Sequence, residues 1–250
     1  MQDANQVSTL LNKNIKLQSR AEDDTVANRS NGYVLLMGSL MYAAIGTRPD
    51  ITYAVNKLCS FTSNPDLEHW TAAKRILRYL KGTKDLGITY TKGNPNEEFH
   101  RYADASLGNN YDMTSTSGNV FLLHNGAITW SSKKQKVVAT STTESEFISM
   151  VQATRQVVWL RNLYTELGYE PTKATMLYAD NRSAIAIATD GKFHQRTTHF
   201  KLKYLRTRQH IQDGTVNVTD CRTDDMTADI FTKALDRAKH QQFTRALGLR

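Results

Sequence analysis

The chain has 250 residues, 40% of them hydrophobic, and a formal net charge of +8. This length allows one sizeable hydrophobic core or two modest ones. The sequence has no apolar run of 18 residues, and its start lacks the features of a signal or transit peptide, so neither a membrane partner nor secretion is expected. The two cysteines, Cys59 and Cys221, are far apart, which argues against a disulfide framework or a zinc site and fits a reducing compartment.

Positive charge is concentrated in the later part of the chain. Residues 1–100 hold 12 Lys/Arg against 10 Asp/Glu, and residues 101–250 hold 20 against 14. A solvated basic surface explains this excess, and so does a polyanionic partner whose phosphates are bound by Lys and Arg. Charge alone leaves both interpretations open.

The early part of the chain is predicted to be helical after a polar start. Residues 1–30 lack hydrophobic periodicity and are expected to form an extended or disordered lead-in. Between residues 33 and 81, three apolar faces at helical spacing predict three short helices, with a break at Arg48-Pro49-Asp50 and an end at Gly82. A strand is expected at residues 86–91. Residues 31–90 are therefore assigned to a small helical subdomain.

From residue 91 onward the hydrophobic pattern changes between strand and helix spacing. The expected strands are 99–105, 118–124, 127–132, 175–178 and 216–219, and the expected helices are 142–167, 182–188, 197–212, 226–235 and 238–247. The pair Asn125-Gly126 predicts a tight hairpin turn. This order predicts an α/β fold over residues 91–236, a mixed five-stranded sheet flanked by helices, followed by a C-terminal helical tail at 237–250.

Four acidic residues fall where such a topology would bring them together: Asp104, Glu146, Asp180 and Asp229. A carboxylate in or at the end of a buried strand is costly unless it is paired or binds a cation. Carboxylate oxygens suit Mg²⁺, and two such ions side by side can hydrolyse a phosphodiester. Each acid also has an ordinary interpretation as a turn former, a helix cap or a complement to a helix dipole.

Ordered motifs along nearly the whole chain carry a family resemblance. They are Gly38-Ser-Leu-Met-Tyr, Thr47-Arg-Pro-Asp-Ile, Ala73-Lys-Arg-Ile-Leu-Arg-Tyr-Leu-Lys-Gly-Thr, Tyr102-Ala-Asp-Ala, Ser115-Thr-Ser-Gly, Trp130-Ser-Ser-Lys-Lys-Gln, Ser141-Thr-Thr-Glu-Ser-Glu, Ala179-Asp-Asn, Arg196-Thr-Thr-His and Ala228-Asp-Ile-Phe-Thr-Lys. With these motifs the sequence resembles the C-terminal part of copia-type (Pseudoviridae) retrotransposon Pol polyproteins.

The resemblance implies a reverse transcriptase thumb or connection segment at 31–90, followed by an RNase H-like domain at 91–236. It implies hydrolysis of the RNA strand of an RNA–DNA hybrid by two Mg²⁺ ions, with Mn²⁺ as an alternative, held by Asp104, Glu146, Asp180 and Asp229. Implied partners are the hybrid and the polymerase palm and fingers of the same polyprotein. Because the palm is absent from this sequence, polymerase activity is not expected. The implied location is a cytoplasmic virus-like particle, with access to the nucleus left open.

Two assignments within the resemblance stay open. Glu144 competes with Glu146 as the ligand from the long helix, and residues two apart cannot face the same way on a helix. We prefer Glu146 because the sequence that follows it resembles the corresponding retroviral helix. The loop before Asp229 lacks the histidine that many RNases H carry there, so His199 is a candidate substitute, with a plain surface histidine as the alternative.

Further residues are predicted to contact the nucleic acid because they adjoin the acids or form basic clusters. They are Ser106, Lys133, Lys134, Lys136, Ser141, Thr142, Asn181, Ser183 and Arg196. Hydroxyl and amide groups of this kind can bind phosphate or the ribose 2′-OH that distinguishes RNA from DNA. A decayed or host-recruited fragment that binds nucleic acid or another protein without catalysis is the alternative function.

Overall fold

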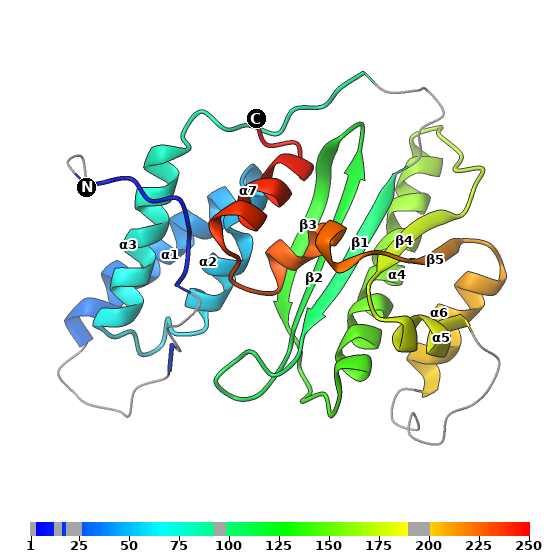
Figure 1. Cartoon of the computed structure of the whole chain (residues 1–250), viewed down its shortest axis with the longest axis horizontal. Coiled ribbons are helices and arrows are strands. Elements are labelled where there is room, and N and C mark those ends of the chain that lie inside the picture. The colour runs from blue at the N-terminus through cyan, green and yellow to red at the C-terminus, as the bar shows by residue number, and fades with distance from the viewer. Residues whose placement is uncertain (1–3, 13–16, 19–26, 93–98, 190–200) are drawn as a thin grey trace.

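The structure is a computed structural model, and it describes residues 4–12, 17–18, 27–92, 99–189 and 201–250 (Figure 1). A group of helices lies at one end of the molecule, a twisted sheet lies in the middle, and further helices cover the far face of the sheet. Within the described residues, no helix is both long and apolar enough to cross a bilayer.

The helical group consists of α1 (Ala27–Gly46), the short 3₁₀ helix η2 (Pro49–Ile51), α2 (Thr52–Cys59) and α3 (Leu67–Gly82). The three predicted helices are therefore present, and the first begins at Ala27, inside the range expected to be lead-in. Their apolar faces form a separate core that contains Met37, Ile51, Leu58 and Ile76. Such burial is the main source of stability for short helices, which are marginal alone.

The described residues 4–12 run in an extended conformation along α3. The Arg75 guanidinium donates to the Thr9 carbonyl at 2.9 Å, Arg78 donates to the Asn5 carbonyl at 2.6 Å, and Lys81 donates to the Ala4 carbonyl at 3.0 Å. Leu10 is buried in the helical core. This part of the predicted lead-in is thus extended and packed.

The sheet contains β1 (His100–Ser106), β2 (Thr116–Leu123), β3 (Gly126–Lys134), β4 (Thr175–Ala179) and β5 (Val216–Asp220). Its order is β3-β2-β1-β4-β5, with antiparallel β1–β2 and β2–β3 pairs and parallel β1–β4 and β4–β5 pairs. The predicted mixed five-stranded sheet is confirmed. The strand expected at 86–91 is wrong: Ile88 forms only an isolated bridge to Leu249. The segment reaches the β2–β3 hairpin through single hydrogen bonds, among them those from the Tyr90 hydroxyl to the Ala127 carbonyl and from the Thr91 backbone to the His124 carbonyl, and not through a ladder.

One face of the sheet is covered by α4 (Thr142–Glu166), α5 (Arg182–Thr189) and α6 (Lys201–Gln212). A core that includes Phe121, Phe147, Met150, Val157 and Leu177 fills the space between the sheet and these helices.

The other face carries η4 (Thr223–Asp225), η5 (Thr227–Phe231) and α7 (Arg237–Ala246). Phe231 and Phe243 pack there on Val120 and Leu122. The helix expected at 226–235 is wrong, since only the short 3₁₀ helix η5 forms. β-Branched residues lower its helix propensity, and its complete burial against the sheet fixes the tighter turn.

Several contacts join the helical group to the sheet and to α7, among them two that involve backbone carbonyls of the helical group. The Trp130 indole of β3 donates to the Ala44 carbonyl at 2.8 Å, and His240 of α7 contacts the Asp50 carbonyl at 3.3 Å. Figure 1 shows α7 between the helical group and the sheet. The predicted C-terminal tail is accordingly packed, and its Leu247 is fully buried.

Candidate metal centre

Three acidic side chains from separate segments meet at one edge of the sheet. Asp104 lies near the end of β1, Asp180 directly follows β4, and Glu146 lies near the start of α4. Because β1 and β4 are parallel neighbours, their carboxyl ends lie side by side. One carboxylate oxygen from each of the three acids lies within 4.8 Å of the others. The fold therefore brings together three of the four acids predicted to bind metal.

Burial and mutual repulsion make these acids hard to ionise. Asp104 and Glu146 are only 2% and 8% exposed, and Asp180 is partly buried. Burial, followed by the charge of Asp229, raises the pKa of Asp104 to about 7. Burial, followed by the charges of Asp104 and Asp180, raises the pKa of Glu146 to about 10, and burial also raises the pKa of Asp180. A bound cation would reverse these shifts, because it favours the ionised carboxylates.

The backbone and side chain of Asp104 are held from both faces of the sheet. From α4, the Ser149 hydroxyl donates to the Asp104 carbonyl at 2.8 Å. From the segment after η5, the Thr232 hydroxyl donates to the Asp104 carboxylate. These contacts fix where the carboxylate points, which is what a metal ligand requires.

Gly118 of β2 lets η5 approach the sheet beside Asp104. It is the register partner of Asp104, and a Cβ atom there would lie 2.5 Å from Thr232 Cγ2 and 2.8 Å from Phe231 Cβ. Only glycine therefore leaves room for this close contact. The Ser115-Thr-Ser-Gly motif thus has a steric role next to the acids.

Asp229 lies apart from the three-acid group and is paired with two lysines. Its side chain is completely buried, with Lys233 Nζ 2.7 Å from Oδ1 and Lys239 Nζ 3.5 Å from Oδ2. Neither oxygen accepts a well-directed hydrogen bond from any described residue. Asp229 still acts electrostatically on Asp104 and Asp180, because its charge raises the pKa of both.

The donor set fits a hard divalent cation. Asp104, Glu146 and Asp180 offer carboxylate oxygens, the ligand type that Mg²⁺ and Mn²⁺ accept. The buried Asp229 oxygens lack directed donors, so they too fit a cation ligand. Among the described residues, Asp104, Glu146 and Asp180 form the only group of three or more His, Cys, Asp or Glu side chains close enough to hold an ion.

The structure separates the two glutamates of α4. Glu146 points into the acidic group, whereas Glu144 accepts hydrogen bonds from the backbone and hydroxyl of Thr140, at 2.7 and 2.6 Å. The Glu144 side chain thus helps to cap the N-terminus of α4. The Ser141 hydroxyl is the N-cap and accepts a hydrogen bond from the Glu144 backbone at 3.1 Å. The arrangement leaves Glu146 as the candidate ligand.

The residues predicted to bind nucleic acid differ in how accessible they are. Lys133 and Lys136 are exposed near the end of β3, on the path to α4, whereas Lys134 is paired with Asp112 at 2.5 Å. Ser106 ends β1 and is partly buried.

The remaining predicted contacts lie at helix starts or outside the described residues. Thr142 and Ser183 are exposed in the first turns of α4 and α5, and the Asn181 side chain accepts from the Ala184 backbone at 3.0 Å, which caps α5. Arg196 and His199 lie outside the described residues.

Sequence reasoning missed four residues that support the acids: Ser149, Thr232, Lys233 and Lys239. Thr232 and Lys233 belong to the Ala228-Asp-Ile-Phe-Thr-Lys motif, and the four-residue spacing of Asp229 and Lys233 was a usable signal for an ion pair. Ser149 and Lys239 gave no such signal, because their partners are defined only by the fold.

The strand order, the β1–β4 parallel pair and the acids at its end define an RNase H-like α/β fold. No protein-family model matches the chain. It is 41% identical over 215 residues to the retrovirus-related Pol polyprotein from transposon RE2 of Arabidopsis thaliana, covering 86% of this chain and 15% of that protein.

It is also 36% identical over 254 residues to the Pol polyprotein from transposon TNT 1-94 of Nicotiana tabacum, covering 100% of this chain and 19% of that protein. The N-terminal RNase H domain of a Mycobacterium tuberculosis protein is similar in structure, with 11% identity, a TM-score of 0.40 and coverage of 59% of this chain and 96% of that one. Over most of its length, the chain is therefore similar to one part of retrovirus-related Pol polyproteins of plant transposons. It spans less than a fifth of the length of these two polyproteins.

Proposed function

We propose that this chain is the ribonuclease H segment of a copia-type Pol polyprotein and hydrolyses the RNA strand of RNA–DNA hybrids. One observation carries the proposal: Asp104, Glu146 and Asp180 converge within 4.8 Å although they come from three separate segments. Their burial makes the group unfavourable when all three acids are ionised. A protein that keeps such an arrangement needs a cation to balance it.

Asp104, Glu146 and Asp180 would hold Mg²⁺, or Mn²⁺ as an alternative. Asp229 would serve as a ligand of a second ion. When bound, such ions supply an activated water and stabilise the charge that develops on the phosphodiester oxygens. The chain's own residues set the positions: Thr232 and Ser149 orient Asp104. Gly118 lets the segment that carries Asp229 and Thr232 lie against β2.

The hybrid is proposed to lie over the edge of the sheet where the acids meet. Lys133 and Lys136 are exposed on the path from β3 to α4, the helix that carries Glu146. Ammonium groups there would contact phosphates, which position a duplex without reading its sequence. The hydroxyls of Ser106, Thr142 and Ser183 are proposed to recognise the ribose 2′-OH, so we expect cleavage with little base preference.

The segment is further proposed to work beside the palm and fingers of the same polyprotein in a cytoplasmic virus-like particle. The similarity to Pol polyproteins supports this, because the chain matches only a part of these longer proteins. Co-purification of the chain with a separately expressed palm and fingers fragment tests it. Failure to co-purify at low salt would remove this part of the proposal.

The deciding experiment is a cleavage assay with a hybrid whose RNA strand carries a 5′ label. With Mg²⁺, we expect RNA fragments that end in a 3′-hydroxyl, and no cleavage of a DNA duplex of the same sequence. With EDTA, cleavage should stop. In the D104N variant it should fall by about a thousandfold or more, because removal of a catalytic group costs this much in other hydrolases.

Glu144 provides a matched control, since it lies two residues from Glu146 on the same helix. E146Q removes a carboxylate from the acidic group and should abolish cleavage. E144Q removes a carboxylate that only caps the helix, so this variant should still cleave the hybrid. Equal activity in E146Q and E144Q would contradict the site. Hybrid binding without cleavage in the unmodified chain would instead favour the non-catalytic alternative.

A further inference from the structure

Lys233 is placed where it controls the fourth acid. Its ammonium lies 2.7 Å from Asp229 Oδ1, and Lys239 lies 3.5 Å from Oδ2. Because Asp229 is completely buried, these two ammonium groups are its counter-ions among the described residues. Asp229 is consequently paired with protein cations, and the charge of Lys233 also acts on Asp104 and Asp180.

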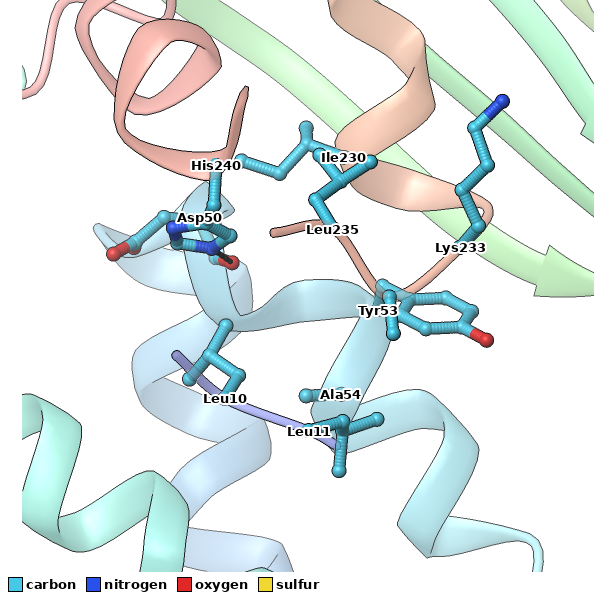
Figure 2. Close-up of a pocket in the computed structure, with 10 residues that line it drawn as sticks. Leu10, Leu11, Asp50, Tyr53, Ala54, Ile230, Lys233, Leu235 and His240 are labelled. Carbon is cyan, nitrogen blue, oxygen red and sulfur yellow. Dashed lines mark hydrogen bonds between the residues drawn. The ribbon is translucent and has the colours of Figure 1, made fainter. Parts of the chain in front are cut away.

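Lys233 lines a small cavity between the helical group and the η5–α7 segment. This cavity, of about 20 Å³, is lined by Leu10, Tyr53, Leu235 and His240 among others. Figure 2 shows the Lys233 side chain running away from the cavity, with its nitrogen at the far end. The lysine thus starts in a packed region and reaches the acids with its flexible end.

The contact between Lys233 and Asp229 is close but poorly directed. The distance is that of an ion pair, yet neither Asp229 oxygen accepts a hydrogen bond of good geometry from a described residue. About 41% of the Lys233 side chain is exposed, whereas Asp229 is fully buried. An ammonium that is not locked by directed bonds and has access to solvent can leave, and the buried carboxylate can then accept another cation.

The charges of the site are consistent with this exchange. When ionised, the four acids and the two lysines leave a formal charge of −2, which one divalent cation balances. A second divalent cation would bring the formal charge to +2; the departure of Lys233 lowers it to +1, and the arrival of a phosphodiester phosphate as well lowers it to zero. Asp104, Glu146 and Asp180 need no rearrangement to hold the first ion, since their oxygens already lie within 4.8 Å.

From this geometry we infer that Lys233 is a positioning residue that acts as an internal counter-ion: it holds Asp229 and thereby limits the free protein to one divalent cation. The second ion binds only when Lys233 leaves Asp229. This inference rests on the proposed function for its biological meaning, but it concerns cation binding in the absence of nucleic acid. It can therefore fail or succeed independently of hydrolysis.

The test is a titration of the full 250-residue chain with MnCl₂ and no nucleic acid, followed by the spin resonance signal of free Mn²⁺. We expect one bound ion per chain for the unmodified protein and two for K233M. The second ion should bind K233M at least about tenfold more tightly than any second ion binds the unmodified protein, because a repulsive positive charge has been removed. K233R keeps the charge and should bind one ion.

Three controls keep the inference decidable. K84M removes an exposed lysine after α3 and should leave one ion, whereas the double variant D229N/K233M should return the count from two to one. D229N changes little volume and should keep the single ion. Circular dichroism will show whether each variant is folded. If K233M does not fold, the ion count of D229N still tests the inference.

Two ions in the unmodified chain, a single ion of unchanged affinity in folded K233M, or loss of the first ion in D229N would each overturn the inference. If no variant cleaves a hybrid but the ion counts behave as expected, the proposed function fails and the role of Lys233 stands. If the hybrid is cleaved but the number of bound ions is the same in K233M as in the unmodified chain, the proposed function stands and the role of Lys233 fails.

Discussion

The helical group and the sheet both bury charged side chains, but among the described residues only the helical group pairs buried opposite charges by directed hydrogen bonds. In the helical group, Arg48 donates two hydrogen bonds to Asp50, at 2.9 and 2.7 Å, and the Tyr79 hydroxyl donates a third at 2.7 Å. Both of these buried charged groups have directed partners. At the sheet edge, acids face acids, and their pKa values are raised.

The comparison shows how structural and functional buried charge can be told apart. A satisfied pair such as Arg48 and Asp50 fixes how two segments pack, and its charges are already neutralised by each other. The group of Asp104, Glu146 and Asp180 remains unfavourable until something positive is added. Four predictions test this difference, from the largest expected effect to the smallest.

Removal of one partner of the satisfied pair should cost most. D50A leaves the Arg48 guanidinium buried without its carboxylate, and we expect a loss of about 3–5 kcal/mol in the free energy of unfolding, measured by urea denaturation. The double variant R48M/D50L has no unpaired charge and should recover most of that loss. If D50A were as stable as the unmodified chain, the pair would not be structural.

Without metal, the acidic group should make stability depend on pH. The folded pKa of Asp104, about 7, lies above its unfolded value of about 3.9, so its contribution is complete below pH about 4 and lost as the pH rises through 7. We expect a loss on the order of 2–4 kcal/mol between these limits, measured in EDTA.

The D104N variant provides the control for this pH dependence. Its loss of stability over the same range should be smaller, because the group that takes up the proton is absent. Addition of Mg²⁺ at pH 8 should stabilise the unmodified chain and not D104N. Identical pH profiles for the two proteins would show that Asp104 does not carry the effect.

Arg101 is a third case, a buried charge without an adequate partner. Its side chain is completely buried over the Phe121 ring, donates to the Ala153 carbonyl, and has an Nε and an Nη2 without an acceptor among the described residues. Burial lowers its pKa. R101M should therefore stabilise the chain by about 1–4 kcal/mol in urea denaturation; a loss of stability would show that the guanidinium has a partner of its own.

Gly118 connects the acids to the packing of the opposite face. G118A places a Cβ atom 2.5 Å from Thr232 Cγ2, so η5 must shift and the Thr232 contact to Asp104 must weaken. We expect a loss of about 1–3 kcal/mol, together with weaker Mn²⁺ binding. Alanine at Gly38, where a Cβ meets nothing within 4 Å, is the matched control and should not weaken Mn²⁺ binding.

Much of the fold could be predicted because it is recorded locally in the sequence. The strand-like hydrophobic pattern located all five strands of the sheet, and Asn125-Gly126 marked the turn between β2 and β3. Residues 86–91 have a strand-like pattern too, but they contact the end of the chain and the β2–β3 hairpin without forming a ladder, which no local pattern reveals. Residues 226–235 have helical spacing, yet burial against the sheet permits only a short 3₁₀ helix.

The sequence by itself determined the order of the elements, the mixed sheet and the four acids, because hydrophobic period and residue chemistry are local properties. Only the tertiary structure decided that Glu146 and not Glu144 joins the acidic group, and that Asp229 is held by Lys233 and Lys239. The physical reason is that the energy of a charge depends on its distance to other charges and to water. Those distances join residues far apart in the chain, and they exist only once the chain is folded.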